Sequence, residues 1–196
     1  MTELGEAQES EMILAFLRAE IDSPRWACRY HISLANAQLD RSTLIDNADL
    51  TNESHNQERR TLLQSVRGYS HKFLFSGFPR DVQWRRVEVE THEHARLKYA
   101  REVNWLRLSD YSRSVIRCVE KMQRDELPKD PADSIRGVQR LLRSGKSFPE
   151  LIAVEGEVGD LVLVEGHVRA TAYVAARQKV VMFLGSSPSM HSWAFY

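Results

Sequence analysis

The chain has 196 residues, of which 42% are hydrophobic, so it is long and apolar enough to bury a core in one domain or two very small ones. Its 27 basic and 27 acidic side chains balance, which excludes a strong overall field that would attract nucleic acid or an anionic membrane. The acidic start MTELGEAQESEM lacks the apolar stretch of a secretory signal, and no apolar run approaches the roughly 20 residues that span a bilayer. We therefore expect a soluble, cytoplasmic protein with no membrane partner.

The cysteine and histidine residues predict no metal site and no disulfide. Cys28 and Cys118 lie far apart in the chain and belong to no CxxC motif or Cys/His pair, so we expect two buried thiols. His92 and His94 form an H-x-H pattern, but no acidic or cysteine partner stands at ligand spacing.

The N-terminal part of the chain is predicted to be helical. Apolar residues recur with a helical period from Ser10 to Ile21, and Asp22-Ser23-Pro24 ends this helix and begins a second one. Residues 40–55 are rich in Asp, Asn, Ser and Thr, which predicts a connecting loop. A third helix is predicted from Asn56 to Tyr69, with Gly68 near its end as a C-terminal cap.

After residue 75 the pattern changes to strands that alternate with helices. Val87 and Val89 alternate with glutamates, which is typical of a half-exposed strand. A short polar helix is predicted from Thr91 to Tyr99, and a second is predicted from its cap, Ser109, to about Gln123. A further helix follows the proline-rich segment after residue 127 and ends at Gly145.

The last fifty residues predict a hairpin that leads into a helix and a final strand. Gly156–Asp160 is the hairpin turn, and Gly166 opens a helix of small residues that runs from Val168 to Arg177. The predicted strands are Leu151–Val154, Leu161–Val164 and Val180–Leu184. The fold class is therefore α+β, with a helical region at 1–75 attached to a domain with a small mixed sheet at 76–196.

One segment of the hairpin and helix carries residues suited to an anion. At Gly166 an apolar strand ends and a helix begins at once, and the first amides of a helix attract negative charge. Gly166 lets the backbone approach a ligand, while Arg169 and His167 can donate hydrogen bonds to the same anion. Glu165, at the strand end, can act as a general base or bind a metal. The alternative is a plain strand-to-helix turn with a capping glycine and a solvent-facing Arg169.

The sequence EGHVRATAY at this place resembles the phosphate-binding motif of the ParB/sulfiredoxin-like superfamily, whose members show forms such as GERRxRA, GCHR and DGHHR. The resemblance covers Val82 to Gly185 in the order of elements and leaves out residues 1–75. It implies that nucleotide phosphates are held by Gly166, His167, Val168 and Arg169. It also places Glu165 where the DGHHR form has its aspartate.

Departures from the three forms limit what the resemblance implies. The sulfiredoxin cysteine would fall at His167, which argues against sulfinic-acid reduction. His167 and Val168 replace a glutamate and an arginine of the GERR form, which puts a CTP-driven clamp in doubt. DGHHR, the nearest form, occurs in ATP- or ADP-dependent members that phosphorylate free serine, but its second histidine is Val168 here.

A second anion site is implied in the segment LSDYSRS. In the superfamily an earlier helix helps to close the nucleotide pocket, which makes Ser112 and Arg113, together with Arg117, candidate phosphate contacts. The alternative is that Ser109 only caps a helix and that Arg113 and Arg117 form an exposed pair.

The resemblance implies a nucleotide-binding protein that uses ATP or another nucleotide with Mg²⁺. A Mg²⁺-dependent ATPase and a small-molecule kinase are both activities of this kind, and the sequence does not decide whether the chain is an enzyme. Two alternatives remain open: a DNA-associated partition or defence factor, which the neutral charge does not favour, and a protein-interaction module with a vestigial pocket.

Overall fold

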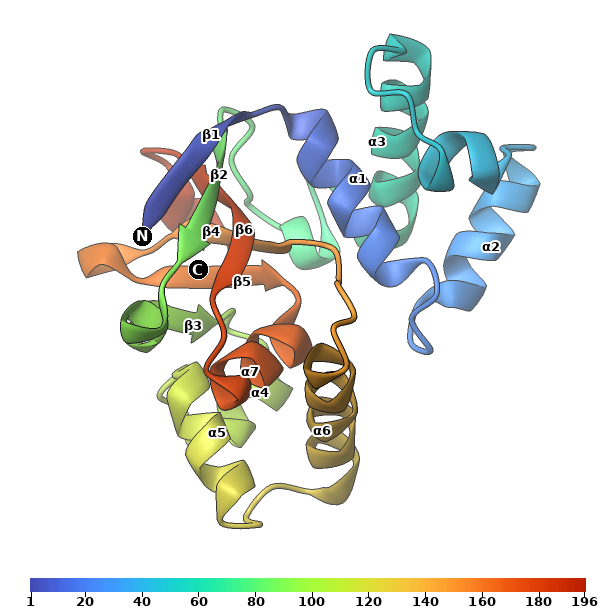
Figure 1. Cartoon of the computed structure of the whole chain (residues 1–196). Helices are drawn as coiled ribbons and strands as arrows, with labels where there is room; N and C mark the ends of the chain where they lie inside the picture. The colour runs from blue at the N-terminus through green and yellow to red at the C-terminus, as the bar shows by residue number, and fades with distance from the viewer.

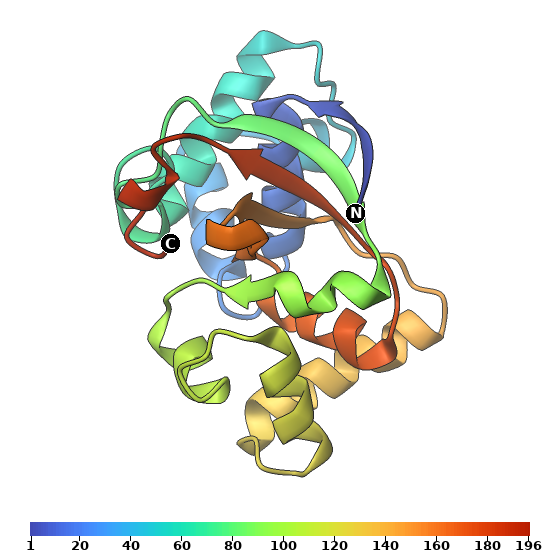
Figure 2. The same ribbon diagram turned by 90° about the vertical axis from the view of Figure 1, so that its left-hand side faces the viewer.

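A mixed β-sheet divides the molecule into two helical layers (Figures 1 and 2). The computed structural model describes residues 1–196. Helices α1–α3 cover one face of the sheet, and α5–α7 cover the other. The α+β fold class predicted from the sequence is confirmed.

The sheet has six strands in the order β1-β2-β6-β4-β5-β3. The strands are β1 (Thr2–Ala7), β2 (Gln83–Val89), β3 (Leu97–Tyr99), β4 (Leu151–Glu155), β5 (Leu161–Glu165) and β6 (Val180–Ser186). The pairs β1/β2, β2/β6 and β4/β5 are antiparallel, whereas β4/β6 and β3/β5 are parallel. The antiparallel pairing of β4 with β5 confirms the predicted hairpin.

Seven α-helices surround the sheet. They are α1 (Glu9–Glu20), α2 (Ala27–Asn36), α3 (Glu53–Arg67), α4 (Val103–Leu108), α5 (Val115–Gln123), α6 (Lys129–Arg143) and α7 (His167–Ala176). The predicted cap at Gly68 is confirmed, because this residue ends α3 with a left-handed φ of 75°. None of the helices combines the length and the apolar composition needed to cross a bilayer.

Successive residues of the central strands belong to two different cores, which explains why β4 and β5 are apolar without alternation. One core lies under α1–α3 and the other lies under α5–α7. The first core takes Ile152, Val154, Val162, Val164 and Phe183 from the strands, and the second takes Leu151, Ala153, Leu161, Leu163, Met182 and Leu184. The helical region 1–75 therefore shares a core with the rest of the chain.

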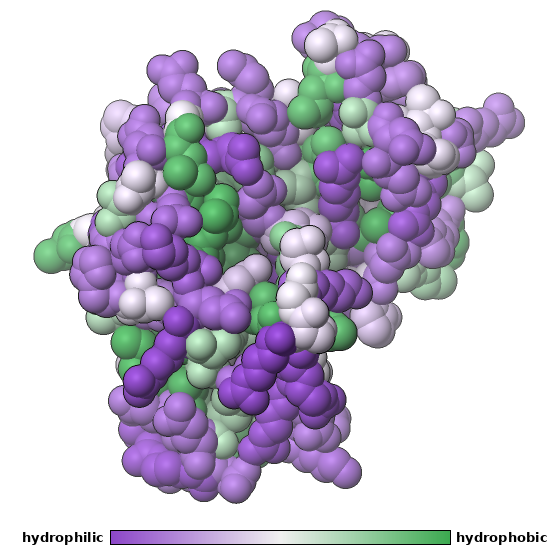
Figure 3. Space-filling view, in the orientation of Figure 1, coloured by the Kyte–Doolittle hydropathy of each residue, from purple (hydrophilic) through white to green (hydrophobic).

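Hydrophilic residues cover most of the face seen in Figure 3, and apolar residues reach this surface over β2 and β6. At the chain's end the buried Trp193 docks on the molecule by donating from Nε1 to the Leu74 carbonyl at 2.7 Å. Of the two cysteines, Cys118 is buried as expected. Cys28 is exposed, so the prediction of a second buried thiol is wrong.

Several local predictions are also wrong. The strand β1 was not predicted, and residues 97–99 form β3 instead of the end of a helix, because Leu97 and Tyr99 are buried in its pairing with β5. Ser109 follows α4 and caps no later helix. The cap of α5 is Ser114, whose hydroxyl accepts a hydrogen bond from the Arg117 amide at 3.3 Å.

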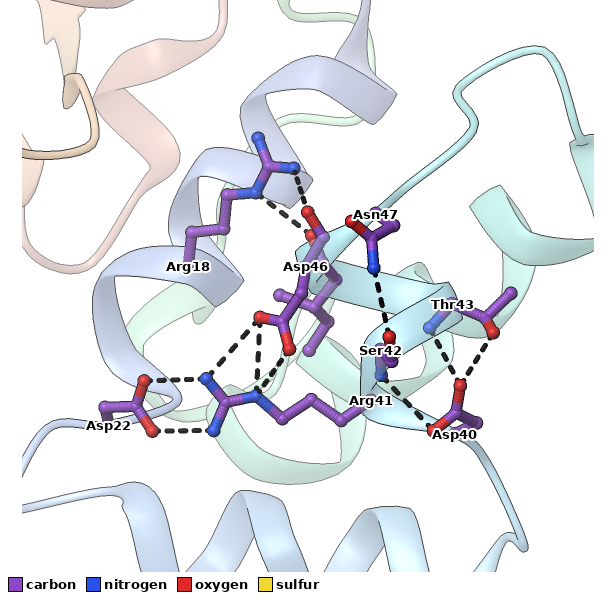
Figure 4. A network of polar contacts seen from close by, with 9 residues as sticks. Arg18, Asp22, Asp40, Arg41, Ser42, Thr43, Asp46 and Asn47 are labelled. Atoms are coloured by element: carbon purple, nitrogen blue, oxygen red, sulfur yellow. Dashed lines mark hydrogen bonds and ion pairs between the residues drawn. The ribbon is translucent and has the colours of Figure 1, made fainter.

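The predicted loop at 40–55 contains a π-helical turn, Ser42–Asp46. Figure 4 shows how its ends are held. The Asp40 carboxylate accepts a hydrogen bond from the Thr43 amide at 2.9 Å, and Arg41 pairs with Asp22 at 2.7 Å and with Asp46 at 3.2 Å. These contacts tie the turn to the end of α1.

Candidate functional site

The turn between β5 and α7 has the geometry that an anion site requires. Strand β5 ends at Glu165, and Gly166 adopts a left-handed φ of 94° before α7 begins. A Cβ at this position would overlap Cδ2 of Leu151, so the close packing also requires glycine. No side chain caps the first turn of α7, so its first amides have no side-chain partner.

Arg169 lies inside the molecule instead of projecting into solvent. The residue is 8% exposed, and its guanidinium forms an ion pair with the Glu165 carboxylate and donates to the Pro149 carbonyl. The interpretation of Arg169 as a solvent-facing arginine is therefore wrong. In this arrangement both terminal nitrogens of Arg169 are engaged, one by the Glu165 carboxylate and one by the Pro149 carbonyl.

His167 lies against two aromatic rings at the start of α7. Its ring stacks on Tyr99 and Trp105, with centroid distances of 5.7 and 5.3 Å, and its Nε2 atom is buried with no hydrogen-bond partner. Burial, together with the positive charges of Arg67, Arg25 and Arg169, lowers the pKa of His167 to about 3. The imidazole is therefore neutral near pH 7 and can offer a neutral hydrogen-bond donor or acceptor, but no charge.

Two further arginines, from the helical layer, lie near enough to His167 for their charges to lower its pKa, and we call Arg25, Arg67 and Arg169 the arginine cluster. Arg67, at the end of α3, lies over the Trp26 ring at 3.9 Å, and its Nε is 3.3 Å from Oε2 of Glu20 without hydrogen-bond geometry. Arg25, just before α2, lies 3.6 Å from Glu102.

Glu20, at the end of α1, contacts residues of both α2 and α3. Tyr30 donates its hydroxyl hydrogen to Oε2 of Glu20 at 3.0 Å, and burial raises the pKa of this carboxyl to about 7. The Arg67 charge opposes this shift, whereas the nearby Glu165 adds to it. Near neutral pH the carboxyl is therefore only partly ionised, and it compensates the Arg67 charge incompletely.

Glu20 and His167 give the folding stability two opposite pH dependences. In the folded protein Glu20 keeps its proton from its ordinary pKa of 4.5 up to about 7, so its contribution falls as the pH rises through this window. His167 stays neutral down to about pH 3, whereas the unfolded residue is protonated below 6.5, so its contribution rises between pH 3 and 6.5. Each group changes the free energy of unfolding by about 1.4 kcal/mol per pH unit within its range, and the two effects oppose each other where the pH ranges overlap.

We expect single substitutions to reveal how each group changes the free energy of unfolding with pH. In Glu20→Gln the free energy of unfolding should rise with pH between 4.5 and 6.5, because the falling contribution of Glu20 is lost. The rising contributions of His167 and of His94, whose pKa burial also lowers, remain. In His167→Gln the free energy of unfolding should fall over the same range. Urea unfolding at half-unit pH steps measures both profiles against the flatter profile of the wild type. Two variants that keep the wild-type profile would contradict the burial of these groups.

The second predicted anion site lies apart from the turn. Ser112 donates its hydroxyl hydrogen to the Ser109 carbonyl at 2.6 Å, and Arg113 donates from Nε to the Tyr99 carbonyl at 2.8 Å. Arg113 thus supports Tyr99, whose ring stacks on His167, and the hydrogen bonds of Ser112 and Arg113 go to Ser109 and Tyr99, not to residues of the turn. Val168 is half-buried and packs against the core under α5–α7.

No three His, Cys, Asp or Glu side chains gather where they could hold a metal ion. No protein-family model, no curated protein and no solved structure matches this chain.

Proposed function

We propose that the chain binds a nucleotide through its phosphates, between the first turn of α7 and the arginine cluster. The observation that carries this proposal is the start of α7, which has no side-chain cap and begins at a left-handed glycine. The positive charges of Arg25, Arg67 and Arg169, which act together to lower the pKa of His167, support it. Helix amides and arginine forks are the groups with which proteins bind phosphate oxygens.

The three arginines have different roles in the proposed site. Arg25 is the most accessible, with 63% of its side chain exposed, and its ion pair with Glu102 is long enough to be exchanged for a phosphate. Arg67 faces Glu20, which is partly protonated near pH 7 and holds the guanidinium weakly. Arg169 adds positive charge and fixes the turn through Glu165.

Two half-buried tryptophans suit the base of a nucleotide. Trp26 lies beside Arg25 and Arg67, and Trp105 stacks on His167. Aromatic rings next to bound phosphates offer a stacking surface for a purine or pyrimidine. ATP with Mg²⁺ is the first ligand to test, because the ion would bridge phosphate oxygens and neutralise part of their charge. The proposal concerns binding only, since the candidate base Glu165 is engaged with Arg169.

Calorimetric titration tests the proposal with ATP, ADP, CTP and GTP, each with and without Mg²⁺. We expect one nucleotide to bind and Arg25→Ala or Arg67→Ala to weaken it about tenfold or more, as loss of a charge-assisted contact does. The matched control is Arg124→Ala in the turn between α5 and α6, where the side chain is 51% exposed and pairs only with Glu126. Unchanged affinity in both test variants, or no binding of any nucleotide, would refute the site.

A further inference from the structure

A cavity of about 420 Å³ lies between α1 and the segment 147–150, which joins α6 to β4. It is separate from the proposed phosphate site, because no member of the arginine cluster and no residue of the first turn of α7 lines it. Its apolar lining residues are Leu14, Ala15, Leu50, Phe148 and Phe183. The volume is within the range of small-molecule sites, roughly 300–1,000 Å³.

Two arginines line the cavity and keep unused donors. The Arg18 guanidinium donates to the carbonyls of Ile45 and Asp46, through Nε at 3.0 Å and Nη2 at 3.2 Å, while Nη1 has no hydrogen-bond partner in the protein. Figure 4 shows Arg18 beside Asp46. Arg86 pairs with Glu150 through Nη2, and its Nη1 has no hydrogen-bond partner in the protein. A ligand oxygen would give these free guanidinium donors a charge-assisted partner.

The two carboxylates that line the cavity are already engaged. Glu11 accepts a hydrogen bond from the Gln8 amide at 2.7 Å, and Glu150 is bound by Arg86. With one oxygen of each carboxylate engaged, the two arginines supply the free cationic donors at the cavity. An apolar lining with two cationic donors is complementary to a molecule with an apolar body and an anionic end.

Residues 147–150, which form one wall of the cavity, are held by side-chain contacts on two sides. Glu150 is held by Arg86 on the cavity side, and the Pro149 carbonyl accepts a hydrogen bond from Arg169 on the side of α7. Because these contacts exist before any ligand binds, binding needs to order little of this segment, which keeps the entropy cost of binding low.

From the unused arginine donors and the apolar lining, we propose that this cavity binds a small amphipathic carboxylate, with the carboxylate on Arg18 and Arg86 and the apolar body against Leu14 and Phe148. The site is independent of nucleotide binding.

A matched pair of probes tests the charge requirement. Indole-3-acetate and its neutral amide, indole-3-acetamide, differ only at the end that would face the arginines. We expect calorimetry on the full chain to show at least tenfold tighter binding of the acetate, and Arg86→Met to reduce its affinity to that of the amide. Phe148→Ala should weaken both probes, because Phe148 contacts the apolar body, and Arg124→Met is the control that leaves both affinities unchanged.

Three results would overturn the proposal: equal affinities for the two probes, an acetate affinity that Arg86→Met leaves unchanged, and no binding of either probe at low millimolar concentration. Because Arg86 is 42% exposed, Arg86→Met is expected to fold. Nucleotide binding by this variant should equal that of the wild type, so a failure here is distinguishable from a failure of the phosphate site.

Discussion

Replacing Arg169 with alanine is expected to lower the free energy of unfolding by about 3–5 kcal/mol, because the substitution leaves the Glu165 carboxylate buried without its partner. The two side chains are only 10% and 15% exposed, so water cannot easily replace the lost guanidinium. The Pro149 carbonyl would lose a donor in the same variant. Urea unfolding at neutral pH measures the loss.

A double substitution separates the cost of an unpaired charge from the value of the ion pair. Replacing Arg169 with methionine and Glu165 with leucine removes both charges, and we expect this variant to recover most of the lost stability. Arg124→Ala, at an exposed pair, should change stability by about 0.5 kcal/mol or less. A loss below about 1 kcal/mol in Arg169→Ala would show that the pair is hydrated and not structural.

The substitution Gly166→Ala is also expected to have a large effect. It should lower the free energy of unfolding by about 2–4 kcal/mol. The φ of 94° is unfavourable for any residue with a Cβ, and the added carbon would overlap the Leu151 side chain in the core. The start of α7 would have to move, which would also displace the amides proposed to hold phosphates.

Gly145→Ala provides a matched control for this substitution. Gly145, just after α6, has a φ of 81°, but an added Cβ would meet no atom within 4 Å. Its substitution should therefore cost only the backbone strain, about 1–2 kcal/mol. Equal unfolding free energies for the two alanine variants would contradict this account. They would mean that the Leu151 side chain can move away from the added carbon without loss of stability, so that packing does not fix the turn.

The parts of the fold that the sequence predicts are those where burial leaves a clear pattern. β4 and β5 stand out because both faces of each strand are covered, and α1 and α3 show a helical period with a buried face. β1 gives no such signal, because four of its six residues are exposed at the edge of the sheet. The three residues of β3 are too few to show a period.

Only the turn of the candidate site could be predicted from the sequence, whereas the arginines that come from the helical region could not. The turn at Gly166 follows from a strand, a glycine and a small-residue helix in direct succession. Arg25 and Arg67 come from the part of the chain that the family resemblance leaves out, and neither shows in sequence which neighbour it will meet. Glu20 does carry a signal, because it stands on the apolar side of α1, four residues after Phe16 and three after Leu17. An acid at such a position predicts a buried partner, and its partners are Tyr30 and Arg67.

The most direct test of nucleotide binding at the arginine cluster is a ¹H–¹⁵N NMR titration of the full chain with ATP and Mg²⁺. If the nucleotide binds there, the amide resonances of Gly166, His167 and Val168 should shift as the ligand is added, together with the Nε–H resonance of Arg67. The Gly145 amide should remain in place. Shifts confined to other parts of the molecule, or a spectrum that the ligand leaves unchanged, would contradict the proposed site.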